Sequence, residues 1–139
     1  MNVRQIFLLI VALGLVPIAI SYGLMPRQSL RYLFDVSIAD TNGIHIFRAI
    51  MGLYLGFTLF WILGAFNVRL RQAALYSLVV FMFGLAAGRG LSVMVDGMPH
   101  WLLIVYLLIE LVFGGIGVFL LKKPDRLAHH GELDSQPPN

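Results

Sequence analysis

Three charged side chains interrupt the long apolar stretches of this sequence: Arg48, Arg89 and Glu110. An arginine binds carboxylate, phosphate or carbonyl oxygens through its planar fork of N–H donors, and a carboxylate accepts hydrogen bonds or exchanges a proton. A charge near the centre of a membrane span costs roughly 2.5–3.5 kcal/mol, so each of the three needs a partner. These residues are therefore the first candidates for binding chemistry.

The elements that must position them are transmembrane helices. The chain is 59% hydrophobic and only 12% charged, whereas soluble proteins carry about 25% charged residues. A bilayer core about 30 Å thick needs about 20 apolar residues in a helix, and four stretches reach that length: residues 6–25, 44–66, 73–95 and 101–121. We therefore predict an all-α membrane protein, a bundle of four transmembrane helices.

The segments between and after these spans complete the organisation. Residues 26–43 carry apolar side chains at helical spacing (Leu30, Leu33, Phe34 and Ile38), which predicts an outer interfacial helix between the first two spans. The connections 67–72 and 96–100 are short, so the last three spans should be antiparallel neighbours. We expect residues 1–123 to form a single transmembrane domain and residues 124–139 to form a disordered cytoplasmic tail.

The basic residues outside the spans predict the orientation of the chain. The side of the two termini carries most of them, and the opposite side carries only Arg27 and Arg31; the larger group is Arg4, Arg69, Arg71, Lys122, Lys123 and Arg126. Because lysine and arginine concentrate on the cytoplasmic side of membrane proteins, both termini are expected in the cytoplasm.

With this orientation, Arg48, Arg89 and Glu110 all lie in the outer half of the bundle. At about 1.5 Å of rise per residue they lie roughly 6, 9 and 13 Å from the outer ends of their helices. The short side chain of Glu110 does not reach the interface, so it needs a cation, a hydrogen bond, water or a proton. We predict Arg89 as its partner, because the third and fourth spans form a tight hairpin and the depths nearly match.

The candidate ligand-binding residues share this outer region: Arg48, Arg89, Glu110, Asp96, Tyr106 and Ser92. A pocket with two guanidiniums and a carboxylate suits a carboxylate, phosphate or quinone-like headgroup with an apolar tail. In the alternative interpretation the charges only fix the register of the helices, because together with Asp96 the three sum to zero.

Other kinds of chemistry have less support. His45 and His100 lie near Asp96 at the outer mouth, but such histidines usually serve as hydrogen-bonded caps, so we predict no metal site. The absence of cysteine excludes Cys-ligated zinc and iron–sulfur chemistry for this chain alone. The sequence has no phosphate-binding loop, and its basic residues mark helix ends rather than a nucleic-acid patch.

Glycines recur about one helical turn apart in three of the spans: Gly52 and Gly56, Gly84 and Gly88, and Gly114 and Gly117. Small residues let helix backbones approach closely in membranes. We therefore expect these positions to pack within the bundle.

Several short motifs resemble those of a known family: Arg48-Ala49-Ile50-Met51-Gly52, then Gly88-Arg89, Ser92, Asp96-Gly97 and Pro99. Over approximately residues 5–123 the chain resembles a bacterial family of small four-helix membrane proteins of unknown function, similar in size and layout to the DoxX-like group. The resemblance implies a multi-pass protein of the bacterial inner membrane, and it favours a quinone or lipid ligand and a partner protein. It supplies no catalytic residue.

Three functions are therefore open. The leading hypothesis is a protein that binds a membrane lipid or quinone in the outer pocket, or that acts as an accessory subunit of a larger membrane complex. The second is a purely structural or assembly protein. The third is a small proton-coupled transporter that uses Glu110, for which four helices are few unless the chain forms a homo-oligomer. Catalysis by this chain alone is the least favoured function.

Overall fold

The computed structural model describes residues 1–123, and its regular structure there is entirely helical. In chain order the helices are α1 (Val3–Gly23), α2 (Pro26–Phe34), α3 (Thr41–Phe66), α4 (Val68–Asp96) and α5 (Trp101–Lys122). All except α2 are long and apolar enough to cross a membrane. The predicted bundle of four membrane-spanning helices is confirmed, whereas the tail predicted at 124–139 lies outside the described residues.

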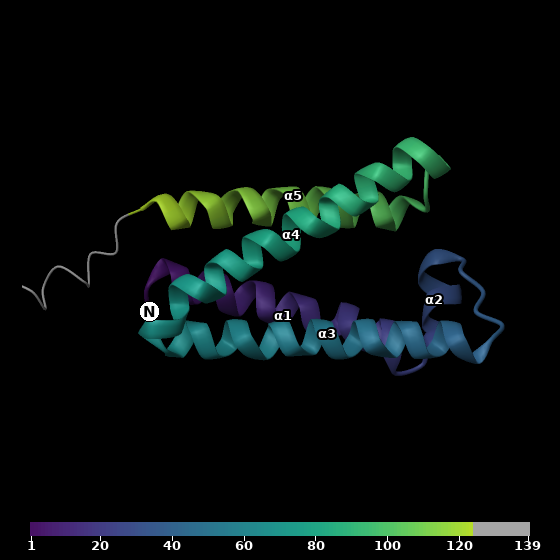
Figure 1. The fold of residues 1–139 in the computed structure, drawn as a ribbon, viewed down its shortest axis with the longest axis horizontal. Helices are drawn as coiled ribbons and strands as arrows, with labels where there is room; N and C mark the ends of the chain where they lie inside the picture. Colours follow the sequence, from purple (N-terminus) through teal and green to yellow (C-terminus); the bar gives the residue numbers. More distant parts are fainter. Residues whose placement is uncertain (124–139) are drawn as a thin grey trace, which may run out of the picture.

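From α3 onward each long helix packs against the next one in the chain, and α1 packs mainly against α3 (Figure 1). The contacts of α3 with α4 and of α4 with α5 confirm the predicted sequential neighbours. The 29 residues of α4 span about 44 Å at 1.5 Å per residue, more than the thickness of a bilayer core. Accordingly α4 crosses the bundle obliquely, as over-long membrane helices do (Figure 1).

Polar side chains set where the helices begin. Asp40 and His100 cap α3 and α5 by accepting a hydrogen bond from a backbone N–H, which satisfies one of the free donors at a helix start. Asn67 does the same for α4 and is the only residue between α3 and α4. Residues 68–72, predicted as a connection, instead form the first turn of α4, because the Asn67 cap lets the helix begin immediately.

The short helix α2 covers one end of the bundle, which we name the α2 end (Figure 1). Its apolar residues Leu30 and Phe34 are buried, and Gln28 and Arg31 are exposed, as the spacing predicted. The helix ends at Phe34, earlier than the apolar pattern suggested, because Asp35 adopts a left-handed conformation with a φ of 61°. α2 packs on α1, α3 and α5.

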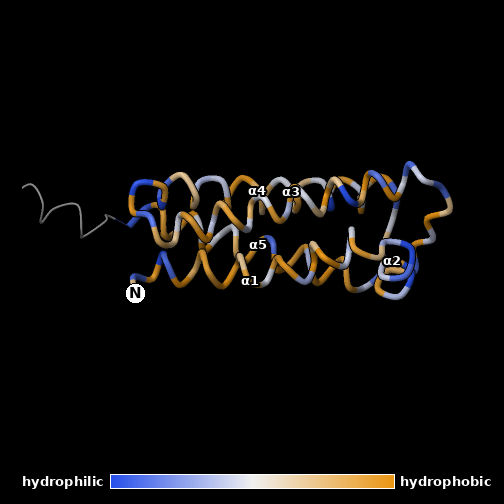
Figure 2. The backbone as a smooth tube through the Cα atoms, turned by 90° about the horizontal axis from the view of Figure 1, so that it is seen from below, coloured by the Kyte–Doolittle hydropathy of each residue, from blue (hydrophilic) through white to orange (hydrophobic). Residues whose placement is uncertain are grey.

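Hydropathy divides the molecule along its length. Hydrophobic stretches fill the middle of the bundle, and hydrophilic stretches gather mainly at its two ends (Figure 2). The end opposite α2 holds the start of α1, the α3–α4 junction and the end of α5, and we name it the terminal end. Large side chains such as Leu13, Val80 and Leu108 are exposed on the outside, as expected of helices that face lipid.

Candidate functional site

An ion pair between Arg89 of α4 and Glu110 of α5 lies inside the bundle. The Nε–H of Arg89 donates to both carboxylate oxygens of Glu110, at 2.9 Å to Oε1 and 3.1 Å to Oε2. The Glu110 side chain is 7% exposed and the Arg89 side chain 20%. The predicted partnership of these two residues is confirmed, and it satisfies the carboxylate that could not reach the interface.

Tyrosines from three other positions surround this pair. The Arg89 Cζ lies 5.7 Å from the centre of the Tyr106 ring, within the range of a cation–π contact. Tyr22 of α1 is a further polar neighbour of the guanidinium, and its ring centre lies 5.8 Å from that of Tyr54 on α3. Side chains of α1, α3, α4 and α5 thus converge on Arg89.

Beside the ion pair is a small cavity of about 50 Å³, which we name the Arg89 cavity. Its walls come from all four long helices and are mostly apolar: Leu15, Ile18, Tyr54, Phe81, Met82, Leu85, Arg89, Tyr106, Ile109 and Glu110. A water molecule needs about 10–15 Å³ of such space, so the cavity has room for a few waters or for one polar group of a ligand. Ligand sites combine apolar walls with a few convergent polar groups in the same way, but they usually enclose about 300–1,000 Å³, so this cavity fits one group of a ligand and not a whole headgroup.

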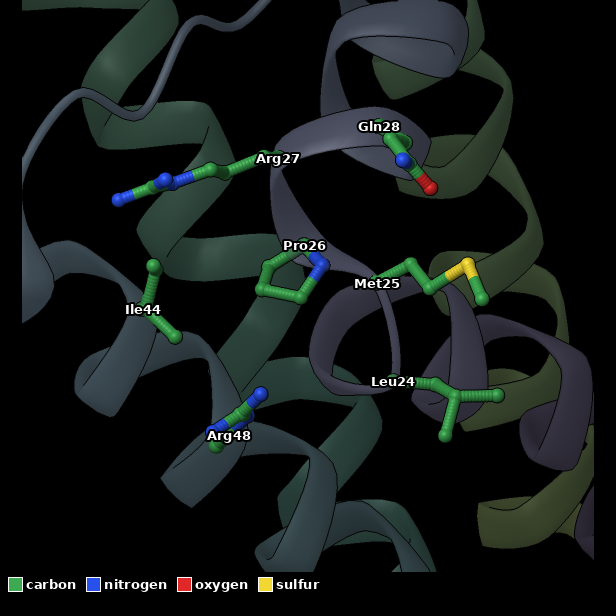
Figure 3. Close-up of a pocket in the computed structure, with 7 residues that line it drawn as sticks. All are labelled: Leu24, Met25, Pro26, Arg27, Gln28, Ile44 and Arg48. Carbon is green, nitrogen blue, oxygen red and sulfur yellow. The ribbon is translucent and has the colours of Figure 1, made fainter.

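The structure does not bring Arg48 into this cavity. Arg48 lines a separate, larger groove of about 300 Å³ at the α2 end, together with Arg27 (Figure 3). Its Nε–H donates to the carbonyl oxygen of Gly23 at 3.4 Å, which turns the side chain toward the end of α1. The three charges predicted to share one pocket therefore divide between two places.

Ser92 and Asp96 also lie apart from the Arg89 cavity. The Ser92 hydroxyl donates to Oδ2 of Asp96 at 2.7 Å, one turn along α4, and both residues are exposed. His100 serves as the N-cap of α5. Residues 1–123 contain no group of three or more side chains placed to hold a metal ion. Of the six candidate residues, the Arg89 cavity collects Arg89, Glu110 and Tyr106.

The glycines that recur along the spans fall into two groups, one packed against a neighbouring helix and one without such a contact. A methyl group at Gly114 or Gly117 would press on Phe83 or Val79 of α4, so these two positions allow the close approach of α5 to α4. The glycine pairs of α3 and α4 have no neighbouring atom within 4 Å of such a group: Gly52, Gly56, Gly84 and Gly88. The expectation that they pack within the bundle is wrong, because their helices turn these faces outward.

A second polar cluster, which sequence reasoning assigned only to topology, lies at the terminal end. Arg71 is buried, and its Nη2 donates to the carbonyl oxygen of Ala65 at 3.2 Å. Gln5 donates to the same oxygen at 2.9 Å, and Arg4 donates to the carbonyl of Lys123. These donors satisfy carbonyls in the last turn of α3 and directly after α5, where positive charge is favourable.

The sequence did carry a signal for the burial of Arg71. It lies three, four and seven residues before Ala74, Leu75 and Leu78, all fully buried, so it shares their helix face. Its Nε has no hydrogen-bond partner among residues 1–123. Tyr22 and Tyr54, also missed, lie on the buried faces of α1 and α3.

Comparison with known proteins adds one match. The family model described as "Domain of unknown function (DUF4345)" matches residues 3–121, almost all of the described chain. No curated protein and no solved structure matches.

Proposed function

The chain belongs to the DUF4345 family, and we propose that it is a multi-pass membrane protein whose Arg89 cavity receives one polar group of a bound lipid or quinone. The ligand would place a carbonyl or carboxyl oxygen beside Arg89. Its apolar tail would leave between the helices. Ile109, which lines the cavity and is 43% exposed, marks the side of α5 along which such a tail reaches the lipid.

The observation that carries this proposal is the spare donor capacity of Arg89. A guanidinium has five N–H groups, and Glu110 takes only the one on Nε. Tyr22 is a second hydrogen-bond partner of the guanidinium, and the Tyr106 ring lies against it, so some of the five N–H groups remain for a ligand oxygen. Because the cavity walls are mostly apolar, a free donor at this wall favours a polar group as its guest.

A fluorescence titration tests the quinone form of the proposal. The chain has two tryptophans, and Trp101→Phe leaves only Trp61, whose ring centre lies 5.4 Å from Phe81 in the cavity wall. Because quinones quench indole fluorescence at short range, decylubiquinone bound in the cavity should quench Trp61 saturably. Arg89→Gln should weaken the apparent affinity about ten-fold, since a hydrogen bond to a charged group contributes about 1.5–3 kcal/mol.

Arg31→Gln is the matched control for this titration, because it removes the same charge from exposed α2 and leaves the cavity intact. Quenching that rises linearly and equally in every variant would report partition into the membrane and contradict quinone binding. For the lipid form, mass spectrometry of extracts from gently purified protein should find a lipid that wild type retains and Arg89→Gln loses. If both measurements show no difference, the cavity does not bind either ligand.

One observation favours a structural role as the second candidate function: the ion pair joins α4 to α5. If Arg89→Gln lowers the melting temperature and changes neither quenching nor bound lipid, the pair only holds the bundle together. The third candidate, proton-coupled transport, requires a Glu110-dependent proton flux in vesicles. The absence of a proton flux with the wild-type protein would exclude transport.

The cellular setting is part of the same proposal. We place the chain in the bacterial inner membrane with both termini in the cytoplasm, and group it with DoxX-like proteins as a binding or accessory subunit of a larger complex or a homo-oligomer. The supporting observation is the gathering of basic residues at the terminal end, where Arg4, Arg71 and Lys123 lie close together. Cytoplasmic loops carry such an excess of lysine and arginine.

A further inference from the structure

The groove at the α2 end is a second candidate site, separate from the Arg89 cavity. It lies where α1 ends, α2 begins and α3 starts, and it encloses about 300 Å³ (Figure 3). Leu24, Met25, Pro26 and Ile44 form its apolar walls. Arg27 comes from α2 and Arg48 from α3, so two cations from different helices face one apolar groove.

Both guanidiniums are poorly satisfied by the protein itself. Arg48 donates to the Gly23 carbonyl and Arg27 to the Ala39 carbonyl, each at 3.4 Å, which is longer than the usual 2.7–3.2 Å of a hydrogen bond. Neither arginine forms an ion pair with a carboxylate of residues 1–123. Most of their N–H donors are therefore available to an anion.

The position of the groove in the membrane favours one kind of anion. Arg48 lies in the second turn of α3, a helix long and apolar enough to span the bilayer, where an unpaired charge is costly. A long arginine side chain lowers that cost by extending toward the headgroup region and binding an anion there. The neighbouring apolar walls favour an anion that carries hydrocarbon with it.

We propose that this groove binds the phosphate group of an anionic phospholipid. Arg27 and Arg48 donate to the phosphate oxygens in charge-assisted hydrogen bonds. The acyl chains lie against Leu24 and Ile44 and continue along the outside of the bundle. This site does not depend on the Arg89 cavity, so a test of lipid binding in the groove is independent of the proposed function.

Native mass spectrometry of the full chain in detergent tests the proposal. The protein is titrated with phosphatidylglycerol and, in parallel, with phosphatidylcholine, and the apparent affinity of each is measured. Wild type should prefer phosphatidylglycerol, and Arg48→Gln should weaken its binding about ten-fold. Arg27→Gln should have a smaller effect in the same direction, and Arg48→Lys should retain part of the affinity because it keeps the charge without the fork.

Arg31→Gln is the control, since it removes one positive charge from α2 outside the groove. Equal binding by wild type, Arg48→Gln and Arg31→Gln would overturn the proposal, as would equal weakening in Arg48→Gln and Arg31→Gln. Circular dichroism of each variant confirms that the helices are intact. Because Arg48 is exposed and weakly bonded, its substitution should leave the fold unchanged.

A competition arm distinguishes a lipid from a soluble anion. Inorganic phosphate in excess is added to the phosphatidylglycerol complex. Persistence of the complex supports the lipid, because the apolar walls hold its chains as well as its phosphate. Displacement of the lipid, together with no preference over phosphatidylcholine, would assign the groove to a free anion and overturn the proposal.

Discussion

The Nε–H of Arg89 holds both carboxylate oxygens of Glu110, at 2.9 and 3.1 Å. This end-on geometry differs from the paired fork, in which two guanidinium nitrogens each meet one oxygen. It lets one donor neutralise the buried carboxylate and join α4 to α5. It also leaves the Nη groups free of Glu110, so the same pair can both stabilise the bundle and present donors to a guest.

The first prediction is that the two residues are strongly coupled in stability. Arg89→Gln or Glu110→Gln alone should each destabilise the bundle by about 3 kcal/mol, because each leaves a buried charge without its partner. The double variant should lose clearly less than the sum of the two single losses. Unfolding in denaturing detergent, followed by circular dichroism, measures these differences.

Ser92→Ala serves as the control for that cycle, because it removes an exposed hydrogen bond between side chains on the same helix. Its effect should stay within about 0.5 kcal/mol. Additive losses in the double variant would show that the two charges act independently, contrary to the contact seen in the structure.

The second prediction concerns Arg71 at the terminal end. Arg71→Gln should destabilise the protein by about 1–3 kcal/mol, because it removes a buried donor to the Ala65 carbonyl at the end of α3. Arg69→Gln, two residues away and exposed, should change stability by less than about 0.5 kcal/mol. Thermal melts of both variants in one detergent make the comparison, and equal melting temperatures would contradict it.

The third prediction separates two glycines of α3. A methyl group at Gly64 would collide with Ala74 at the α3–α4 junction, whereas one at Gly56 meets no atom within 4 Å. Gly64→Ala should therefore lower stability by about 1–3 kcal/mol, the usual cost of overpacking. Gly56→Ala should be neutral or slightly stabilising, since alanine favours helix. A reversed order of the two melting temperatures would refute the close packing of Gly64 against Ala74.

Much of the fold can be predicted from patterns along the sequence. The four spans were predictable because each apolar run is long enough to cross a bilayer, and caps such as Asp40 and His100 follow from local hydrogen bonding. The Arg89–Glu110 contact was also predictable, because a tight hairpin fixes which depths on two helices face each other. The depth of a residue along its helix can therefore be predicted from the sequence.

The rotation of each helix about its own axis was much harder to predict from the sequence. Arg48 lies at a depth similar to that of Arg89, but packing of α3 on α1 turns it toward Gly23 and the α2 end. For the same reason the Gly52 and Gly56 pair faces outward. In uniformly apolar helices every face looks equally suitable for burial, so only side-chain packing decides which one turns inward.

The last prediction tests the orientation of the chain in the membrane. The chain has no cysteine, so single cysteines can be placed at Val68, in the first turn of α4, and at Met98, in the α4–α5 connection. Both positions are exposed, at 62% and 79%, and they lie at opposite ends of α4. If basic residues hold the terminal end in the cytoplasm, a membrane-impermeant maleimide added to intact cells should label Met98→Cys and not Val68→Cys. Permeabilised cells should label both, which controls for reactivity, and labelling of Val68→Cys alone in intact cells would invert the proposed topology.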